Sequence, residues 1–237
     1  MSAMPIRYLP WMALDLARSA GLGMALVGVL AAFLISSMTV VTTGTGGEEM
    51  VFLGILDFAV TLFALLATAG IVSTDFAFGY YRTLFARPIS PPLYYLQRWL
   101  LGGLLVLLAT SVVGLAAAAR IGAQLPIGLV LVQSALFYLL LGGLVLLLST
   151  ITRRDWLIAA LVVAAHAGLG AARSLGAGGT GAAAVLYTLL PPFGLVDVSE
   201  QVPTGANLVH VLLYGIALVV AALAVIRLRP LARGARE

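Results

Sequence analysis

Apolar residues in this chain form long, nearly unbroken blocks separated by short polar stretches. A bilayer core about 30 Å thick needs roughly 20 apolar residues of helix. The blocks that meet or approach this length are residues 21–41, 51–72, 99–119, 126–148, 156–172 and 206–226. Backbone groups in lipid must be hydrogen-bonded within their own segment, which favours helices. The pattern predicts an all-α, polytopic membrane protein with six transmembrane helices, and one transmembrane domain over residues 1–237.

Arginines between the blocks predict the orientation, because positive residues collect on the cytoplasmic side. Arg120 and Arg173 fall on one side of the predicted membrane. The other basic residues fall on the opposite side: Arg7, Arg18, Arg82, Arg87, Arg98, Arg153, Arg154, Arg227, Arg229, Arg233 and Arg236. We therefore expect a multi-pass protein of the inner (cytoplasmic) cell membrane with both termini in the cytoplasm. Trp11, Trp99 and Trp156 lie at predicted inner boundaries and are expected to anchor there.

Residues 1–18 precede the first block and carry an amphipathic pattern. Leu9, Met12 and Leu16 share one helical face, while the charged residues lie elsewhere. This favours an interfacial helix on the inner membrane surface. The alternative is a cytoplasmic extension of the first span.

Residues 173–205 separate the last two blocks. They begin glycine-rich and continue into a short apolar run that Pro191 and Pro192 end. The run is too short to cross, so we predict an outer re-entrant segment. A seventh crossing is the alternative, and it would place the arginine-rich tail outside.

The composition agrees with lipid as the main solvent. The chain is 62% hydrophobic and 9% charged, whereas soluble domains carry about 25% charged residues. It has no cysteine and no lysine, which excludes thiolate sites and an ordinary phosphate-binding P-loop. Two distant histidines make a metal site improbable. We expect no catalytic residues, no metal and no cofactor on this chain, and no nucleic-acid partner.

The polar stretch after the second block carries the most information. Ser73 or Thr74 can cap a new helix, and the helix dipole favours the negative charge of Asp75 in its first turn. Prolines then end the helix: Pro88, Pro91 and Pro92. We predict a helix over residues 75–86, too short and too polar to cross, at the cytoplasmic surface.

One face of this predicted helix combines small and charged side chains. Asp75, Gly79, Arg82 and Ala86 recur at helical spacing. Such a stripe suits docking into a groove of another protein. An ordinary interfacial loop helix that touches only lipid and neighbouring spans is the alternative.

The same stretch resembles a known family. Asp75, Gly79, Arg82, Leu84, Ala86-Arg87-Pro88-Ile89-Ser90, Tyr94-Tyr95 and Arg98 form a pattern similar to that of the membrane (permease) subunits of type-2 ABC exporters. Asp75 stands where that pattern has Glu, and Pro91 where it usually has a basic residue.

The resemblance implies that residues 75–86 are a coupling helix that docks on a separate ABC ATPase. Asp75, Gly79, Arg82, Ala86 and Arg87 are then the docking residues, and ATP and Mg belong to the partner. It also implies a homo- or heterodimer of permeases that meet through the first and fifth spans. The expected function is a permease subunit that couples ATP hydrolysis on its partner to export. The alternative is a non-transporting scaffold or accessory subunit of a larger membrane complex.

Two ionisable residues lie within predicted spans. Asp57 is in the second span and His166 near the middle of the fifth. Intramembrane ionisable groups are costly, so each is a candidate for the translocation path. Asp57 could pair with His210 or Arg173, or be a hydrogen-bonded packing residue. His166 could relay protons, or serve as a satisfied hydrogen-bonding partner between helices.

Overall fold

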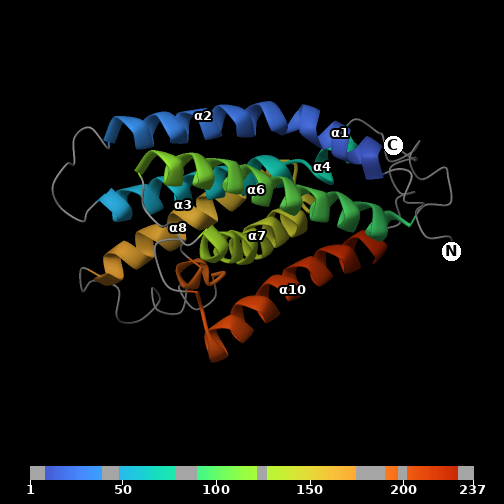
Figure 1. The fold of residues 1–237 in the computed structure, drawn as a ribbon. Coiled ribbons are helices and arrows are strands. Elements are labelled where there is room, and N and C mark those ends of the chain that lie inside the picture. The colour runs from blue at the N-terminus through green and yellow to red at the C-terminus, as the bar shows by residue number, and fades with distance from the viewer. Residues whose placement is uncertain are drawn as a thin grey trace.

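The computed structural model describes residues 9–38, 48–77, 90–121, 127–174, 190–196 and 202–228, and every regular element in these ranges is helical (Figure 1). This confirms the predicted all-α fold class. The elements are α1 (Leu9–Ser19), α2 (Gly21–Met38), α3 (Glu48–Thr68), α4 (Ser73–Ala77), α6 (Pro91–Ile121), α7 (Ile127–Ser149), α8 (Asp155–Ser174), the 3-10 helix η2 (Phe193–Leu195) and α10 (Gly205–Leu228).

Four to five of the described elements are long and apolar enough to cross a membrane. Four qualify alone: Phe52–Asp75, Pro91–Ala119, Ile127–Ser149 and Gly205–Leu228. The bent pair α1–α2 makes a fifth if it counts as one crossing. The apolar part of α8 within the described residues, Asp155–Gly168, is shorter. The sixth crossing, predicted over residues 156–172, therefore stays a prediction.

The surface of the bundle carries many large apolar side chains, as expected of helices that face lipid. More than half of the accessible area of Leu26, Phe33, Leu104, Leu213 and Val220 is exposed. Exposure of such a surface to water would be unfavourable, whereas the hydrocarbon core of a membrane solvates it.

Helix α7 lies at the centre of the bundle, between α6 and α10 in Figure 1, and contacts α3, α6, α8 and α10. Its most extensive contact is with α10. A Cβ at Gly143 would lie 3.4 Å from the carbonyl oxygen of Gly215, and one at Gly215 would lie 2.5 Å from Cγ of Leu139. Glycines at this crossing let the two backbones approach closely, as small residues do between membrane helices.

Helices α1 and α2 are two arms of one bent helix, with 52° between them. Helical hydrogen bonds continue through the bend, from Ala20 N to Leu16 O and from Met24 N to Ala20 O, both at 2.9 Å. Met12 and Leu16 are buried, as their shared face predicted, while Trp11 is 68% exposed. Helix α1 is therefore continuous with α2 through a bend at Ala20 and packs one face on α6. Its place at the inner membrane surface stays a prediction.

The start of α6 differs from the prediction. The apolar block suggested residue 99, but the helix begins at Pro91. Proline is tolerated in a first helical turn because the N–H that it lacks has no partner there. Trp99 is therefore well inside the helix and 7% exposed. Its role as an interfacial anchor was a wrong prediction: its ring lies 5.2 Å from that of Tyr138 on α7.

Candidate functional site

A four-residue turn connects α3 to α4, and we call residues 69–77 the elbow. Gly70 begins it with φ of +72°, the left-handed region that glycine adopts without a steric penalty. A Cβ at this position would collide with Oγ1 of Thr74. The backbone N–H of Thr74 donates to Gly70 O at 3.1 Å, which closes the turn into α4. The chain thus passes from the end of a long apolar helix into the start of the segment that the sequence singles out, and Phe52–Asp75 is long and apolar enough to count as one span through this turn.

Arg98 of α6 holds the elbow from one side. Its Nη1 lies 3.4 Å from both carboxylate oxygens of Asp75 and 3.4 Å from the carbonyl oxygen of Ile71. The Asp75 and Arg98 side chains are only 8% and 14% exposed. A buried carboxylate is costly unless it is paired, so this contact decides whether Asp75 can remain inside the protein.

Two further groups complete this cluster. The Tyr95 side chain, one turn before Arg98 on α6, is close enough to Asp75 to favour its charged form. Nη2 of Arg98 also lies 3.9 Å from Asp15 of α1, whose side chain is 57% exposed. The arginine therefore links α6 to both α4 and α1.

Asp155, the first residue of α8, holds the elbow from the other side. Its Oδ2 accepts hydrogen bonds from Gly70 N at 3.0 Å and Ser73 Oγ at 3.3 Å, and its Oδ1 accepts one from Trp156 N at 2.9 Å. Burial raises the pKa of Asp155 above its ordinary value, and the hydrogen bonds from Trp156, Gly70 and Ser73 oppose that shift. One carboxylate thus caps α8 and fixes the elbow to it.

The elbow is therefore fixed to two helices that are distant in sequence. Asp75 connects it to α6, and Gly70 and Ser73 connect it to α8. Since the remaining part of the polar segment follows Ala77, any force on that segment reaches both helices through these polar contacts. The arrangement is suited to transmitting motion.

Of the predicted docking residues, Asp75 alone lies in the part of the chain that the structure describes. Asp75 lies in the described helix α4 and is 6% exposed, with its carboxylate directed to Arg98. Gly79, Arg82, Ala86 and Arg87 lie outside the described residues. So does most of the helix predicted over residues 75–86, of which the structure describes the part up to Ala77. Docking by these residues stays a prediction.

His166 has a satisfied structural role. It is 6% exposed, and its Nε2 accepts a hydrogen bond from Gly194 N at 3.0 Å. The Phe193 ring lies 5.6 Å from the imidazole. The contact lies eight residues before the end of α8 at Ser174, or about 12 Å along the axis. This favours the interpretation of His166 as a packing partner, and it places η2 alongside α8 rather than beyond its end.

Asp57 is half-buried on α3. Its predicted partner His210 is exposed on α10, with its ring 6.1 Å from that of Tyr214. The side chain of Arg173, the other predicted partner, lies outside the description. A role for Asp57 in a translocation path remains a prediction.

Asp155 and Asp15 were missed by the sequence analysis. Asp155 did carry a signal, because an acidic residue directly before an apolar block is typical of a helix N-terminus. No sequence signal indicated the contact of Asp155 with Gly70, because 85 positions separate the two residues.

These features define a helical, membrane-protein-like fold whose elbow is held in place by Arg98 of α6 and Asp155 of α8. No family model matches the chain, and neither a curated protein nor a solved structure does.

Proposed function

We propose that this chain is the membrane-spanning permease subunit of an ATP-driven exporter of the type-2 ABC class. The pattern from Asp75 to Arg98 carries the proposal. The structure of the elbow supports the proposal, because Asp75 and Arg98, which begin and end that pattern, form a buried ion pair at 3.4 Å. The pair closes the segment between them into a loop that α6 and α4 hold at its base.

In this proposal, residues 75–86 dock on a separate ABC ATPase through Gly79, Arg82, Ala86 and Arg87. Asp75 positions the docking helix rather than binding the partner, since its carboxylate is occupied by Arg98. Closure of the ATPases moves the docked helix. The elbow then transmits that motion to α6 through Arg98 and to α8 through Asp155.

A second permease copy completes the proposed transporter. Helices α2 and α8 both present broad exposed apolar faces, with Leu22, Leu26 and Val29 on α2 and Leu157 and Leu161 on α8. These are the first and fifth predicted spans. Both termini lie in the cytoplasm of a cell whose inner membrane holds the dimer, and residues 173–205 form the outer re-entrant segment.

Affinity purification of the tagged chain from its native membrane tests the proposal. An ABC ATPase encoded beside it is expected to co-purify. Arg82→Glu and Gly79→Trp should each abolish that capture, because one reverses a charge on the docking face and the other fills it. Arg153→Glu is the matched control: Arg153 is exposed in the connection between α7 and α8, and the variant should retain the partner.

The outcome separates the two candidate functions. If no ATPase co-purifies, the chain is a scaffold or accessory subunit. If an ATPase co-purifies equally well with both variants, it docks elsewhere, and residues 75–86 do not couple it.

A further inference from the structure

An ordered turn connects α7 to α8. The backbone N–H of Thr152 donates to the carbonyl oxygen of Leu148 at 2.8 Å. The backbone N–H of Arg154 donates to the hydroxyl oxygen of Thr152 at 3.2 Å, and its carbonyl oxygen accepts from Ile158 N at 3.1 Å in the first turn of α8. These bonds fix the backbone on both sides of Arg153, so two neighbouring arginines are held on an ordered support.

The positive charges of this turn have no acidic partner in the described part of the chain. Arg153 and Arg154 are both exposed, and the ion pairs formed within the described residues belong to Arg98 instead. The next residue, Asp155, is 1% exposed and directs its carboxylate to the elbow. The two guanidinium groups are therefore available to an anion from outside this chain.

Exposed apolar side chains lie on both sides of the arginine pair. Ile151 precedes it and is 63% exposed, and Trp156 follows it and is 52% exposed. Tryptophan is enriched where the hydrocarbon of a membrane meets the headgroup layer. At 3.6 residues per turn, Trp156 lies about 100° around α8 from Leu157, so a molecule on the tryptophan leaves the Leu157 face open to a second copy. Positive charge next to exposed apolar surface matches the two parts of a phospholipid, a charged headgroup and an acyl chain.

We propose that Arg153, Arg154 and Trp156 form a binding site for an anionic phospholipid. The phosphate of the headgroup pairs with the two guanidinium groups, which suit phosphate oxygens, and an acyl chain lies against the tryptophan ring. The site does not depend on ATPase docking. It adjoins Asp155, so a bound headgroup steadies the end of α8 to which the elbow is fixed.

Quenching of tryptophan fluorescence by brominated lipids tests the proposal, because bromine quenches the rings that its acyl chain touches. The full chain is reconstituted at low salt in vesicles of phosphatidylcholine and phosphatidylglycerol, with one of the two lipids brominated at a time. Trp156→Phe isolates the signal, since the emission that it removes from the wild type belongs to Trp156. Each arginine near the membrane surface contributes about fivefold to the affinity for an anionic lipid. Trp156 should therefore prefer phosphatidylglycerol over phosphatidylcholine by about 25-fold.

Removing the charges should remove this preference stepwise. Arg153→Gln and Arg154→Gln should each lower it about fivefold, and the double variant should abolish it. Arg227→Gln is the matched control, because it removes the same charge from an exposed position at the end of α10. It should keep the preference of the wild type.

Three results would overturn the site. One is equal quenching of Trp156 by the two lipids in the wild-type chain. Another is an unchanged preference in the double variant. The third is an equal loss in Arg227→Gln, which would mean that the overall charge of the chain attracts the lipid rather than this arginine pair.

Discussion

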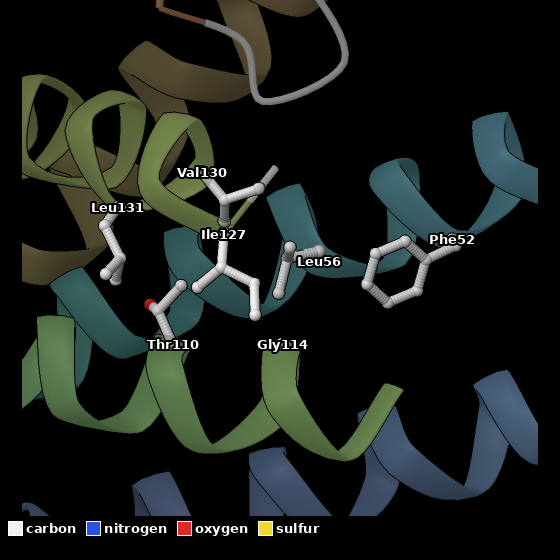
Figure 2. A pocket seen from close by; sticks show the side chains of 7 residues that line it. All are labelled: Phe52, Leu56, Thr110, Gly114, Ile127, Val130 and Leu131. Carbon is white, nitrogen blue, oxygen red and sulfur yellow. The ribbon is translucent and has the colours of Figure 1, made fainter. Parts of the chain in front are cut away.

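The two ends of the bundle share α3 and α6 but are held together by different kinds of contact. At the elbow end, α3, α6 and α8 are connected by an ion pair and by hydrogen bonds to a buried carboxylate. At the opposite end, which we call the pocket end, α3, α6 and α7 meet mainly through apolar side chains around a small pocket of about 10 Å³ that Leu56, Gly114 and Val130 help to line (Figure 2). Polar contacts have a required geometry and lose their energy when it changes, whereas apolar contacts can slide. We infer that the elbow end moves as a unit and that the pocket end accommodates the movement.

Breaking the ion pair should have the largest effect. Arg98→Met leaves Asp75 buried without its partner, which should cost about 3 kcal/mol of unfolding free energy. Circular dichroism during titration with a denaturing detergent measures it. The double variant Asp75→Asn/Arg98→Met removes both charges and should recover most of the loss. Arg153→Met, at an exposed position, should stay within about 0.5 kcal/mol of wild type. A similarly small change in Arg98→Met would show that the pair does not hold the elbow.

Alanine at Gly102 should be the next most disruptive change. Its Cβ would lie 2.7 Å from the Tyr138 hydroxyl and 3.2 Å from the carbonyl oxygen of Ala67. That hydroxyl donates to Trp99 O at 2.6 Å, so moving it breaks a buried hydrogen bond. We expect a loss of about 2 kcal/mol. Tyr138→Phe removes the colliding atom, and Gly102→Ala should cost less in that background. Equal costs in the two backgrounds would rule out this collision.

Removing the carboxylate that caps α8 should have an intermediate effect. Asp155→Ala leaves Gly70 N–H, Ser73 Oγ and Trp156 N–H without this acceptor. We expect a loss of about 1–2 kcal/mol in the same titration. Asp155→Asn retains one acceptor oxygen and should lie between alanine and wild type. If asparagine is as damaging as alanine, the charge matters rather than the hydrogen bonds.

Alanine at Gly114 should have the smallest effect, and of opposite sign. It is the same substitution in the same helix as Gly102→Ala, but its Cβ enters the pocket and meets nothing within 4 Å. Because alanine is the better helix former, stability should rise by about 0.5–1 kcal/mol. A loss as large as that of Gly102→Ala would mean that the pocket end is packed as tightly as the rest.

The sequence predicted the helices best where the cause is local. The blocks at residues 126–148 and 206–226 match α7 (Ile127–Ser149) and α10 (Gly205–Leu228) closely, because apolar length alone defines them. The start of α6 was missed, since the polar and aromatic residues of its first turns are buried by contacts with α1 and α4 that periodicity does not reveal.

The candidate site divides in the same way. The sequence singled out Asp75 and Arg98 but not their pairing. It gave no indication that Gly70 and Asp155 meet, because a single pattern cannot specify a contact between residues 85 positions apart. The sequence did not predict the pocket either. A glycine that packs and a glycine that leaves space look alike until the neighbouring helices are in place.

The side of the membrane on which the elbow lies tests the proposed function most directly. The chain has no cysteine, so Thr74→Cys, at an exposed position of α4, and Asn207→Cys, at an exposed position of α10, are unique labelling sites. A membrane-impermeant maleimide should label position 74 only from the cytoplasmic side and position 207 only from outside. Labelling of position 74 from outside would place the elbow away from any ATPase and contradict coupling through it.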